Sequence, residues 1–510
     1  MKKYILFIFL ITSVSSYAQV PDDALKLSWH TGNGSARNIA IGGVMGSLGG
    51  DISAANINPA GLGLYKTNEF VFSPGFLNFN NKINYRGTDT STTKSGFSYG
   101  PIGFIFGNPS RYTPSNFTSS AVSISVNQLA SYNNHIQYKG FNNFSSFSEQ
   151  YLEELIRDKA DTNAALSNYI FGSSLAFRSY LIDTIRGANG SVAGYQSLVP
   201  ITSGINQYYD ATTTGGYHEV ALGLAGNIQD KLYIGGSLVI PIVSYKRNFT
   251  FREVDATSNT NNQFANFTYS EQFQSSGVGV GAKLGLIYKP QDSWRLGFAF
   301  HTPQIITFTD KIRSSLITNT ESYAGTIKVT SDELNNGNAG ERKYNVTTPY
   351  RAIGSISYVF REVKDVRKQK GFISADLEFV NYKGARFKVQ NAEDFNRTSY
   401  LDKVNDGVKN YFKGNLNFKL GGELKFNVFA VRLGTAYFGS PYVDKQIAAS
   451  KVLATGGIGY RNKGMFIDLG YAHTFVKDVN FPYRLNDIAN TYATQTGSTS
   501  NIVLTLGFKW

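Results

Sequence analysis

Short segments in which apolar and polar residues alternate recur along the whole chain, and this alternation constrains the fold more than any other feature. The C-terminal segment NIVLTLGFKW shows it clearly, with apolar residues at every even position from Ile502 to Trp510. Successive side chains of a strand point to opposite faces, so such a segment has one apolar and one small or polar face. In the segment 415–426 lysines and a glutamate occupy the second face. A polar barrel interior accommodates such charges, whereas the core of a soluble sandwich does so only at a cost.

We count fourteen such segments and predict that they are the strands of one sheet. They cover residues 67–78, 94–106, 118–132, 216–228, 231–251, 266–289, 293–309, 343–360, 371–382, 414–426, 428–438, 451–461, 464–476 and 498–510. Short and long connections alternate along this series, as periplasmic turns and extracellular loops do in outer-membrane barrels, and an even strand number lets the sheet close. The sequence therefore predicts an all-β fold, a transmembrane antiparallel β-barrel of about 14 strands.

The composition fits a secreted barrel. The chain of 510 residues contains 51 Gly, 32 Tyr and 37 Phe but no Cys, so disulfides do not stabilise it. Lys2 and Lys3 precede an apolar run from Tyr4 to Val14, which predicts a signal peptide over 1–18. That run is too short for a transmembrane helix, which needs about 20 residues. We therefore expect the mature protein in the outer membrane of a Gram-negative bacterium.

Signals for catalysis, cofactors and nucleic-acid binding are weak. The net charge of +13 comes from scattered basic residues without a long basic run, so we do not expect a nucleic-acid partner. No nucleophile elbow, phosphate loop or zinc-protease motif occurs, and the five histidines are never at ligand spacing. The glycine-rich segment 277–282 imitates a dinucleotide loop, but alternation continues through it and no helix follows. We predict no catalytic residue, no metal site and no cofactor.

Two long loops contain helical patterns. Ser146 and Glu149 have the spacing of a capping box. The apolar faces that we single out are formed by Leu152, Leu155 and Ile156 in one loop and by Leu401, Val404 and Val408 in the other. These faces either pack on the barrel rim or form a groove for an apolar ligand, and both can hold at once.

Charges of both signs are predicted to face the lumen. By alternation they are Glu219, Lys283, Arg295, His301, Arg351, Asp376, Glu378, Lys419, Glu423, Lys425, Arg432 and Asp468. One interpretation is a hydrogen-bonded network that braces a plug. The other is that a few cations bind the anionic head of an amphipathic ligand, with Arg295 and Arg432 as the best candidates and Lys283 third.

The region 34–64 contains a Gly/Ala-rich run, Asp51 and the motif Asn58-Pro59-Ala60 just before the first strand. It resembles the N-terminal hatch of the FadL/TodX family of outer-membrane channels for hydrophobic compounds. Segments 293–303 and 420–444 look like the seventh strand and the tenth and eleventh strands of that family. The resemblance implies a hatch over 19–66 inside a barrel over 67–510.

The family resemblance also implies a function. Long-chain fatty acids or other hydrophobic molecules are captured by extracellular loops, pass to a lumen pocket and leave sideways through a gap in the wall without energy input. The partners implied are a hydrophobic small molecule, outer-membrane lipid and lipopolysaccharide, and we expect a monomer. The family's wall gap comes from a kinked third strand, whereas here the third segment lacks Gly and Pro, and Gly100-Pro101 interrupts the second instead.

Other functions stay open at this level. A structural or secretion-associated barrel would bind partner proteins through its long loops. A general porin would conduct small polar solutes, which a plugged lumen disfavours. An outer-membrane hydrolase would need a nucleophile and base that the sequence does not show.

Overall fold

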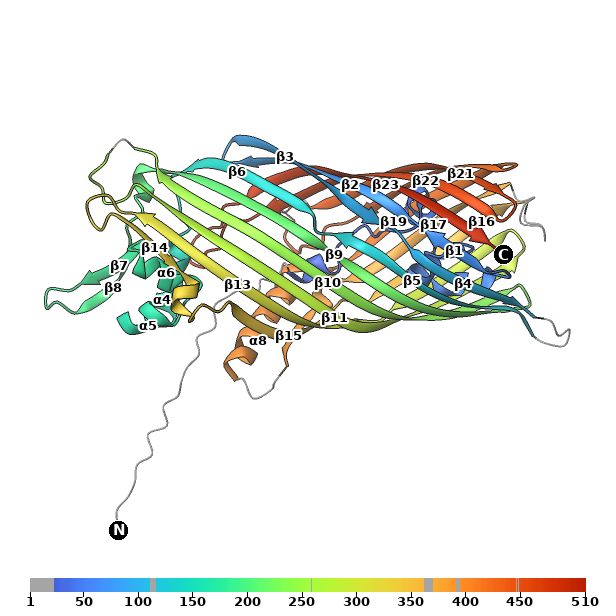
Figure 1. The fold of residues 1–510 in the computed structure, drawn as a ribbon, viewed down its shortest axis with the longest axis horizontal. Helices are drawn as coiled ribbons and strands as arrows, with labels where there is room; N and C mark the ends of the chain where they lie inside the picture. The colour runs from blue at the N-terminus through green and yellow to red at the C-terminus, as the bar shows by residue number, and fades with distance from the viewer. Residues whose placement is uncertain are drawn as a thin grey trace, which may run out of the picture.

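The first and last strands of the chain pair with each other, and this closes the sheet into a barrel (Figure 1). Glu69 lies opposite Lys509, and Phe72 lies opposite Leu506. The computed structural model describes residues 23–110, 116–257, 259–361, 370–390, 395–445, 447 and 449–510, so the predicted signal peptide lies outside it. The predicted all-β barrel of fourteen antiparallel strands is confirmed.

Six of the wall strands are interrupted, so each of them carries two labels. In chain order the wall consists of β1 (Glu69–Phe72) with β2 (Pro74–Tyr85), β3 (Thr88–Tyr99) with β4 (Ile102–Pro109), β5 (Phe117–Ser131) with β6 (Asn134–Asn142), β9 (Ile205–Ile228), β10 (Leu232–Asp255), β11 (Asn266–Gln291), β12 (Trp294–His301) with β13 (Ile305–Asn319), β15 (Gly340–Thr347) with β16 (Arg351–Phe360), β17 (Gly371–Asn381) with β18 (Arg386–Val389), β19 (Gly414–Phe426), β20 (Phe429–Phe438), β21 (Ser450–Asn462), β22 (Met465–Asn480) and β23 (Ala493–Lys509). Tight turns such as Gln229-Asp230, with φ of 54° and 56°, join strands at the end that we call the turn end.

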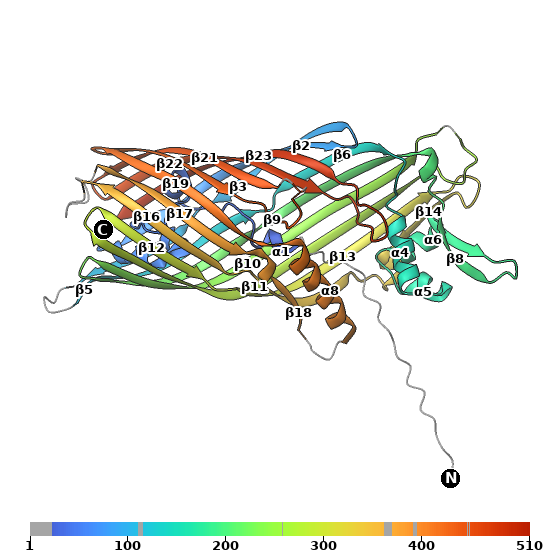
Figure 2. The same cartoon turned by 180° about the vertical axis from the view of Figure 1, so that it is seen from behind.

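Long connections lie at the opposite end, which we call the loop end (Figure 2). They contain α4 (Glu149–Arg157), α5 (Thr162–Ser167), α6 (Ser173–Arg178), a separate hairpin of β7 (Ile182–Arg186) and β8 (Val192–Ser197), η2 (Ile201–Ser203), β14 (Thr326–Thr330) and α7 (Ser331–Leu334). Between β17 and β18 lies η4 (Tyr382–Gly384), and α8 (Phe395–Tyr411) follows β18 nearer the middle of the barrel's length (Figure 2). The N-terminal segment contains α1 (Asp23–Lys26), α2 (Ala36–Ala40), α3 (Ala54–Ile57) and η1 (Pro59–Leu64). No helix among the described residues is both long and apolar enough to cross a membrane.

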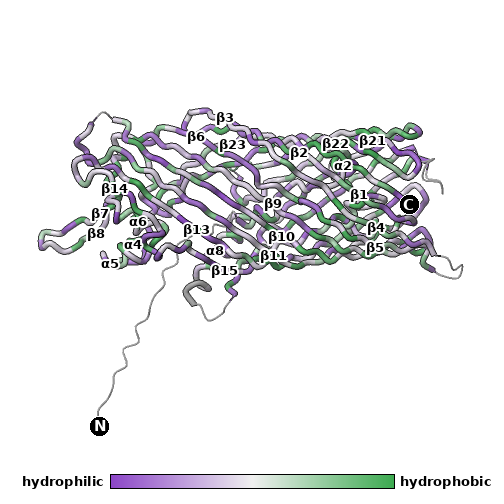
Figure 3. The backbone as a smooth tube through the Cα atoms, in the orientation of Figure 1, coloured by the Kyte–Doolittle hydropathy of each residue, from purple (hydrophilic) through white to green (hydrophobic). Residues whose placement is uncertain are grey.

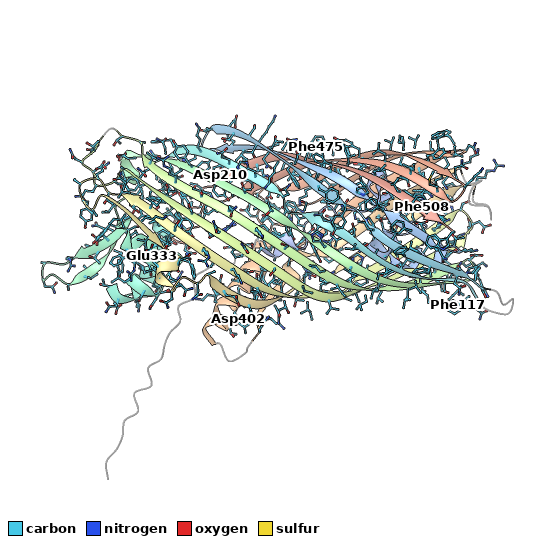
Figure 4. The ribbon with its side chains drawn as sticks, viewed as in Figure 1. Phe117, Asp210, Glu333, Asp402, Phe475 and Phe508 are labelled. Carbon is cyan, nitrogen blue, oxygen red and sulfur yellow. The ribbon has the colours of Figure 1, made fainter. Side chains whose placement is uncertain are left out.

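Hydrophobic residues are more frequent toward the turn end of the barrel and hydrophilic residues toward the loop end (Figure 3). On β11 the outward side chains from Val278 to Tyr288 are mostly large and apolar, whereas Gln272, Gln274 and Ser276 follow toward the loop end. A bilayer requires about 9–11 residues of a tilted strand, which is the length of this apolar stretch. Phe508, near the turn end, and Phe475, nearer the middle of the barrel, are both exposed on the wall (Figure 4). The turn-end half therefore spans the membrane, and the loop-end half extends beyond it.

Residues 23–64, which we call the plug, lie among the inward-facing side chains of the wall. The backbone N–H of Ala36 donates to Oγ1 of Thr505 on β23 at 2.8 Å. On β17, Oδ2 of Asp376 accepts from the N–H of Met45 at 3.0 Å. These contacts reach well-separated strands, so the plug is held from several sides. The exact limits of the hatch, 19–66, stay a prediction.

Several strands are longer than the alternation predicts. Segments 67–78 and 94–106 continue toward each other as β2 and β3 and meet in a two-residue turn, Arg86-Gly87, whose φ angles are 49° and 83°. Likewise β6 and β9 extend into the predicted long loop. Beyond the membrane an outward residue has no reason to be apolar, so the period-two signal disappears although the strand continues.

Candidate functional site

A cavity of about 370 Å³ lies in the lumen on the loop-end side of the plug. Plug residues from Lys26 to Asn33 border it, together with apolar wall residues such as Leu129 and Phe438. Further toward the loop end, inward-facing aromatic residues pack against α4 in a cluster that includes Phe147 and Phe251. The cavity therefore lies in the lumen between the plug and this cluster and is partly open, and its size is that of a small-molecule site.

Cations outnumber carboxylates around the cavity. Its charged lining residues are Lys26, Lys283, Arg351, Lys419 and Lys451 against Glu219 and Glu378. An excess of positive charge beside apolar walls suits a molecule with an apolar body and an anionic head, because charge-assisted hydrogen bonds to a carboxylate are strong.

Carbonyl groups of the plug hold several of these cations. The ammonium of Lys283 forms an ion pair with Glu219 and donates to the carbonyl of Asn56 at 3.0 Å. Lys451 donates to the carbonyl of Trp29 at 2.6 Å, and its Nζ lies 3.9 Å from the centre of the Trp29 ring. A shift of the plug would therefore change the hydrogen bonds available to a ligand.

Arg295 and Arg432 occupy other places. Arg432 is buried on β20 near the turn end, where Nε lies 2.6 Å from Glu423 and Nη1 lies 2.7 Å from Asp468. Arg37 of the plug shares Glu423 at 3.2 Å, so this network braces the plug against the wall. Arg295 is buried on β12, and of the three cations singled out, only Lys283 is a described lining residue of the cavity. Direct ligand contact by Arg295 or Arg432 stays a prediction.

The two predicted apolar faces in the loops both lie on helices. On α4, Leu155 is fully buried, Leu152 packs against the aromatic cluster and Ile156 is 61% exposed. Leu401, Val404 and Val408 of α8 are buried in a second cluster that also contains plug residues. Glu149 accepts from the N–H of Ser146 at 2.7 Å, as in a capping box. Ligand binding by these faces stays a prediction.

The motif Asn58-Pro59-Ala60 joins the plug to the wall. Asn58 is fully buried, its Oδ1 accepts from the N–H of Ala60 at 3.1 Å, and its Nδ2 donates to the carbonyl of Gly46 at 2.5 Å. Carbonyls of the wall residues Leu286 and Phe298 each lie 3.3 Å from the same Nδ2. Asn58 thus caps η1 and fastens it to β11 and β12. A gating role for the motif stays a prediction.

The barrel wall has a gap beside the cavity. β4 pairs with β5, but beyond Gly100-Pro101 the described segment β3 pairs only with β2 and has no ladder with β5 or β6. Side chains close the gap instead, because Asn133 donates to the carbonyl of Ser95 at 3.0 Å and Thr92 donates to that of His135 at 2.6 Å.

A plug residue also lies at this gap. Asn33 donates through Nδ2 to the carbonyl of Tyr99 on β3 at 2.9 Å, and its own carbonyl accepts from Asn127 on β5 at 3.0 Å. Sequence analysis missed Asn33 and Lys451. The alternation of residues 451–461 places Lys451 on the inward face of its strand, so the sequence does indicate that this lysine faces the lumen. No pattern around Asn33 indicates where that residue lies.

Among the described residues, no group of three or more His, Asp and Glu side chains is placed to hold a metal ion.

Known structures share this fold. No protein-family model and no curated protein sequence matches the chain. A FadL homologue from Pseudomonas aeruginosa superposes with a TM-score of 0.53 at 13% identity, over 92% of this chain and 98% of that one. The Pseudomonas putida toluene transporter TodX gives 0.51 at 12% identity, over 94% and 99%. The resemblance to FadL and TodX is thus confirmed as a likeness of fold.

Proposed function

We propose that this barrel takes up hydrophobic or amphipathic molecules passively across the outer membrane, with long-chain fatty acids as a fitting class. The lumen cavity carries this proposal, because it combines apolar walls with an excess of cations and lies directly beside the wall gap. A transporter of toluene has the same fold, which supports a hydrophobic substrate. Transport needs no catalytic group, so we assign no enzymatic activity.

The gap between β3 and β5 offers a route out of the cavity. Leu77 and Phe79 of β2 and Leu129 of β5 line the cavity near this gap. Separating β3 from the strand formed by β5 and β6 requires the loss of side-chain hydrogen bonds rather than a backbone ladder, so this part of the wall opens at lower cost than a fully paired part. An apolar molecule would leave here into the membrane.

A disulfide across the gap tests this route. A Cβ atom on Gly96 would lie 3.4 Å from Cγ of Asn133, the atom whose place the sulfur of a cysteine at 133 would take, so the two thiols can meet across the gap. The chain has no cysteine, so the pair Gly96→Cys with Asn133→Cys is the only one present. We expect cells with the wild-type protein to accumulate radiolabelled hexadecanoate, and we expect oxidation of the variant to reduce this uptake about tenfold, reversibly on reduction.

Two outcomes would contradict the proposal. Equal uptake by cells with and without the wild-type protein would exclude transport of this probe. Undiminished uptake through the fully oxidised variant would exclude the gap as the route while leaving transport intact. The single variant Asn133→Cys under the same oxidant is the control.

A second candidate function is the binding of partner proteins. The β7–β8 hairpin forms a sheet of its own at the loop end, away from the barrel wall, and exposes Ile185 and Val192 (Figure 1). Exposed apolar residues on a projecting hairpin favour an interaction surface. Stoichiometric co-purification of a partner that is lost on deletion of 182–197 would support this function.

A further inference from the structure

A second interruption of the barrel wall lies beside α8. β17 pairs with β19 as far as Asn381 opposite Gly414. After η4, the described segment β18 pairs with β15 and has no ladder with β19. The wall at this point therefore contains an unpaired strand edge, which is costly unless another group covers it.

Helix α8 covers that edge. Oδ1 of the buried Asn405 accepts from the backbone N–H of Phe387 at 2.8 Å, and its Nδ2 donates to the Phe387 carbonyl at 2.9 Å. One side-chain amide thus replaces the two backbone groups that a neighbouring strand would present. Asn405 thus joins the middle of α8 to β18 by two side-chain hydrogen bonds, whereas ordinary wall strands are held by long backbone ladders.

The C-terminal end of α8 is fixed more firmly. Phe412 forms a β-bridge with Tyr442, the N–H of Val443 donates to the carbonyl of Tyr411 at 2.8 Å, and Lys413 donates to Pro441 at 2.9 Å. The rest of α8 is held by side chains, through the Asn405 amide and the buried apolar residues Leu401, Val404 and Val408, so the helix can swing about its tied end without breaking a backbone ladder.

The outer side of α8 is polar and its inner side is apolar. Asp402 lies on the outside of the barrel (Figure 4), and Lys403 and Asp406 are also exposed. Leu401 and Val408 are buried in a cluster that includes Phe387 and the plug residues Leu25, Leu27 and Trp29. Leu27 and Trp29 also line the cavity, so a continuous apolar path leads from beneath α8 to the cavity.

The position of α8 along the barrel matches the edge of the membrane. Leu416 on β19 and Tyr437 on β20 are outward, exposed and close to the loop-end limit of the apolar belt. The paired wall ends just beyond them, at Gly414. A molecule dissolved in the outer leaflet would therefore meet α8 without entering water.

We propose that α8 is the lid of a side port through which amphipathic anions pass from the outer leaflet of the membrane into the cavity. This inference rests on the proposed transport function. It adds an entry route for the ligand to the proposed exit route between β3 and β5. The outer side of β18 and α8 carries Arg386, Lys388, Lys403 and Lys409 against Asp402 and Asp406, and this net positive charge matches an anionic head. The plug residues Leu25 and Leu27 occupy the apolar path until a ligand displaces them.

A cross-link between α8 and β18 tests the port. Asp406 and Lys388 are exposed and each is adjacent to one member of the Asn405–Phe387 pair, so a short bis-maleimide can join Asp406→Cys to Lys388→Cys. The matched control joins Lys311→Cys to Lys343→Cys on β13 and β15, which are exposed and lie on strands paired by a ladder. Uptake of radiolabelled hexadecanoate by intact cells is measured with and without the reagent.

We expect the α8 cross-link to reduce uptake about tenfold, because a lid that cannot leave the wall abolishes the open population, while the control cross-link leaves uptake unchanged. Equal uptake through the two cross-linked proteins would overturn the port and leave transport standing. No uptake in any variant before cross-linking would overturn the proposed function itself. As a second measurement, hexadecanoate should accelerate thiol labelling of Val408→Cys, because Val408 is fully buried on the inner face of the lid helix. An unchanged labelling rate would count against opening of the lid.

Discussion

Gly285 and Asn58 form one of the closest contacts between the wall and the plug. A Cβ atom on Gly285 would overlap with Oδ1 of Asn58, so only glycine leaves room for the asparagine that caps η1. Asn58 in turn donates to wall carbonyls on both sides of this position. The fit of plug to wall therefore depends on single atoms at residues far apart in the sequence.

Gly285→Ala should destabilise the folded barrel by about 1–3 kcal/mol, because the methyl group forces Asn58 or the strand to move in a packed interior. Urea unfolding in detergent, followed by fluorescence, measures this change. Gly236→Ala is the matched control, since its Cβ would face outward at 3.7 Å from the nearest atoms. Equal unfolding midpoints for the two variants would show that the plug is not seated as described.

Alternation predicted which residues face inward but not what they do there. It placed Lys283, Arg295 and Arg432 on the lumen side, and all three are buried. Whether an inward cation borders the cavity or braces the plug depends on its height in the barrel relative to the plug. The plug has no periodic pattern, and its contacts with the wall span hundreds of residues, as between Arg37 and Glu423. Local sequence contains no signal for such pairs.

Among the elements, α4 shows how the loop end is held together. The carboxylate of Glu154 on α4 points into the protein, and its burial raises the pKa of the carboxyl group to about 7. A hydrogen bond from Ser173 and the positive charge of Arg157 oppose this rise. Folding thus favours the protonated form. The stability that this gives the α4–α6 region is complete below the ordinary pKa of the carboxyl and is lost as pH rises through about 7.

Trypsin should therefore cleave after Arg157 faster at about pH 8 than at about pH 6, once the change in the enzyme's own rate is removed. Glu154→Gln keeps the shape of the side chain and cannot ionise, so its corrected cleavage rates at the two pH values should be equal. The ratio of wild-type to variant rates at each pH provides the correction. A ratio that does not change with pH would show that Glu154 does not control the opening of α4.

The sequence indicated most of the strands and helices but few of the residues at which they begin and end. Fourteen strands were predicted because the membrane requires apolar outward residues, and this requirement stops where the wall leaves the bilayer. The helical faces of α4 and α8 were also predicted. That α8 stands in the wall rather than on the rim follows from the missing ladder between β18 and β19, which is a property of the closed sheet and not of the helix.

The molecule as a whole closes its lumen twice. The plug fills the turn-end half, and the aromatic cluster with α4 packs in the loop-end half, so the cavity lies between them and borders the side wall at Leu77 and Leu129. A passive channel for apolar molecules gains from this arrangement, because a continuous aqueous path would let polar solutes leak through the membrane.

Two independent closures predict the conductance of deletion variants. Removal of 23–64 should leave the single-channel conductance in planar bilayers low, because the cluster around Phe147 and Phe251 still blocks the loop end. Removal of 149–178, which contains α4 to α6, should also leave it low, because the plug is still present. Only the combined deletion should open a stable aqueous pore, with a conductance greater by about an order of magnitude, as expected for an unplugged wide barrel.

Retarded migration of unheated samples on gels would verify that each variant still forms the barrel. A large conductance after removal of the plug alone would show that the loop-end cluster does not seal the lumen, and the cavity would then be an open vestibule.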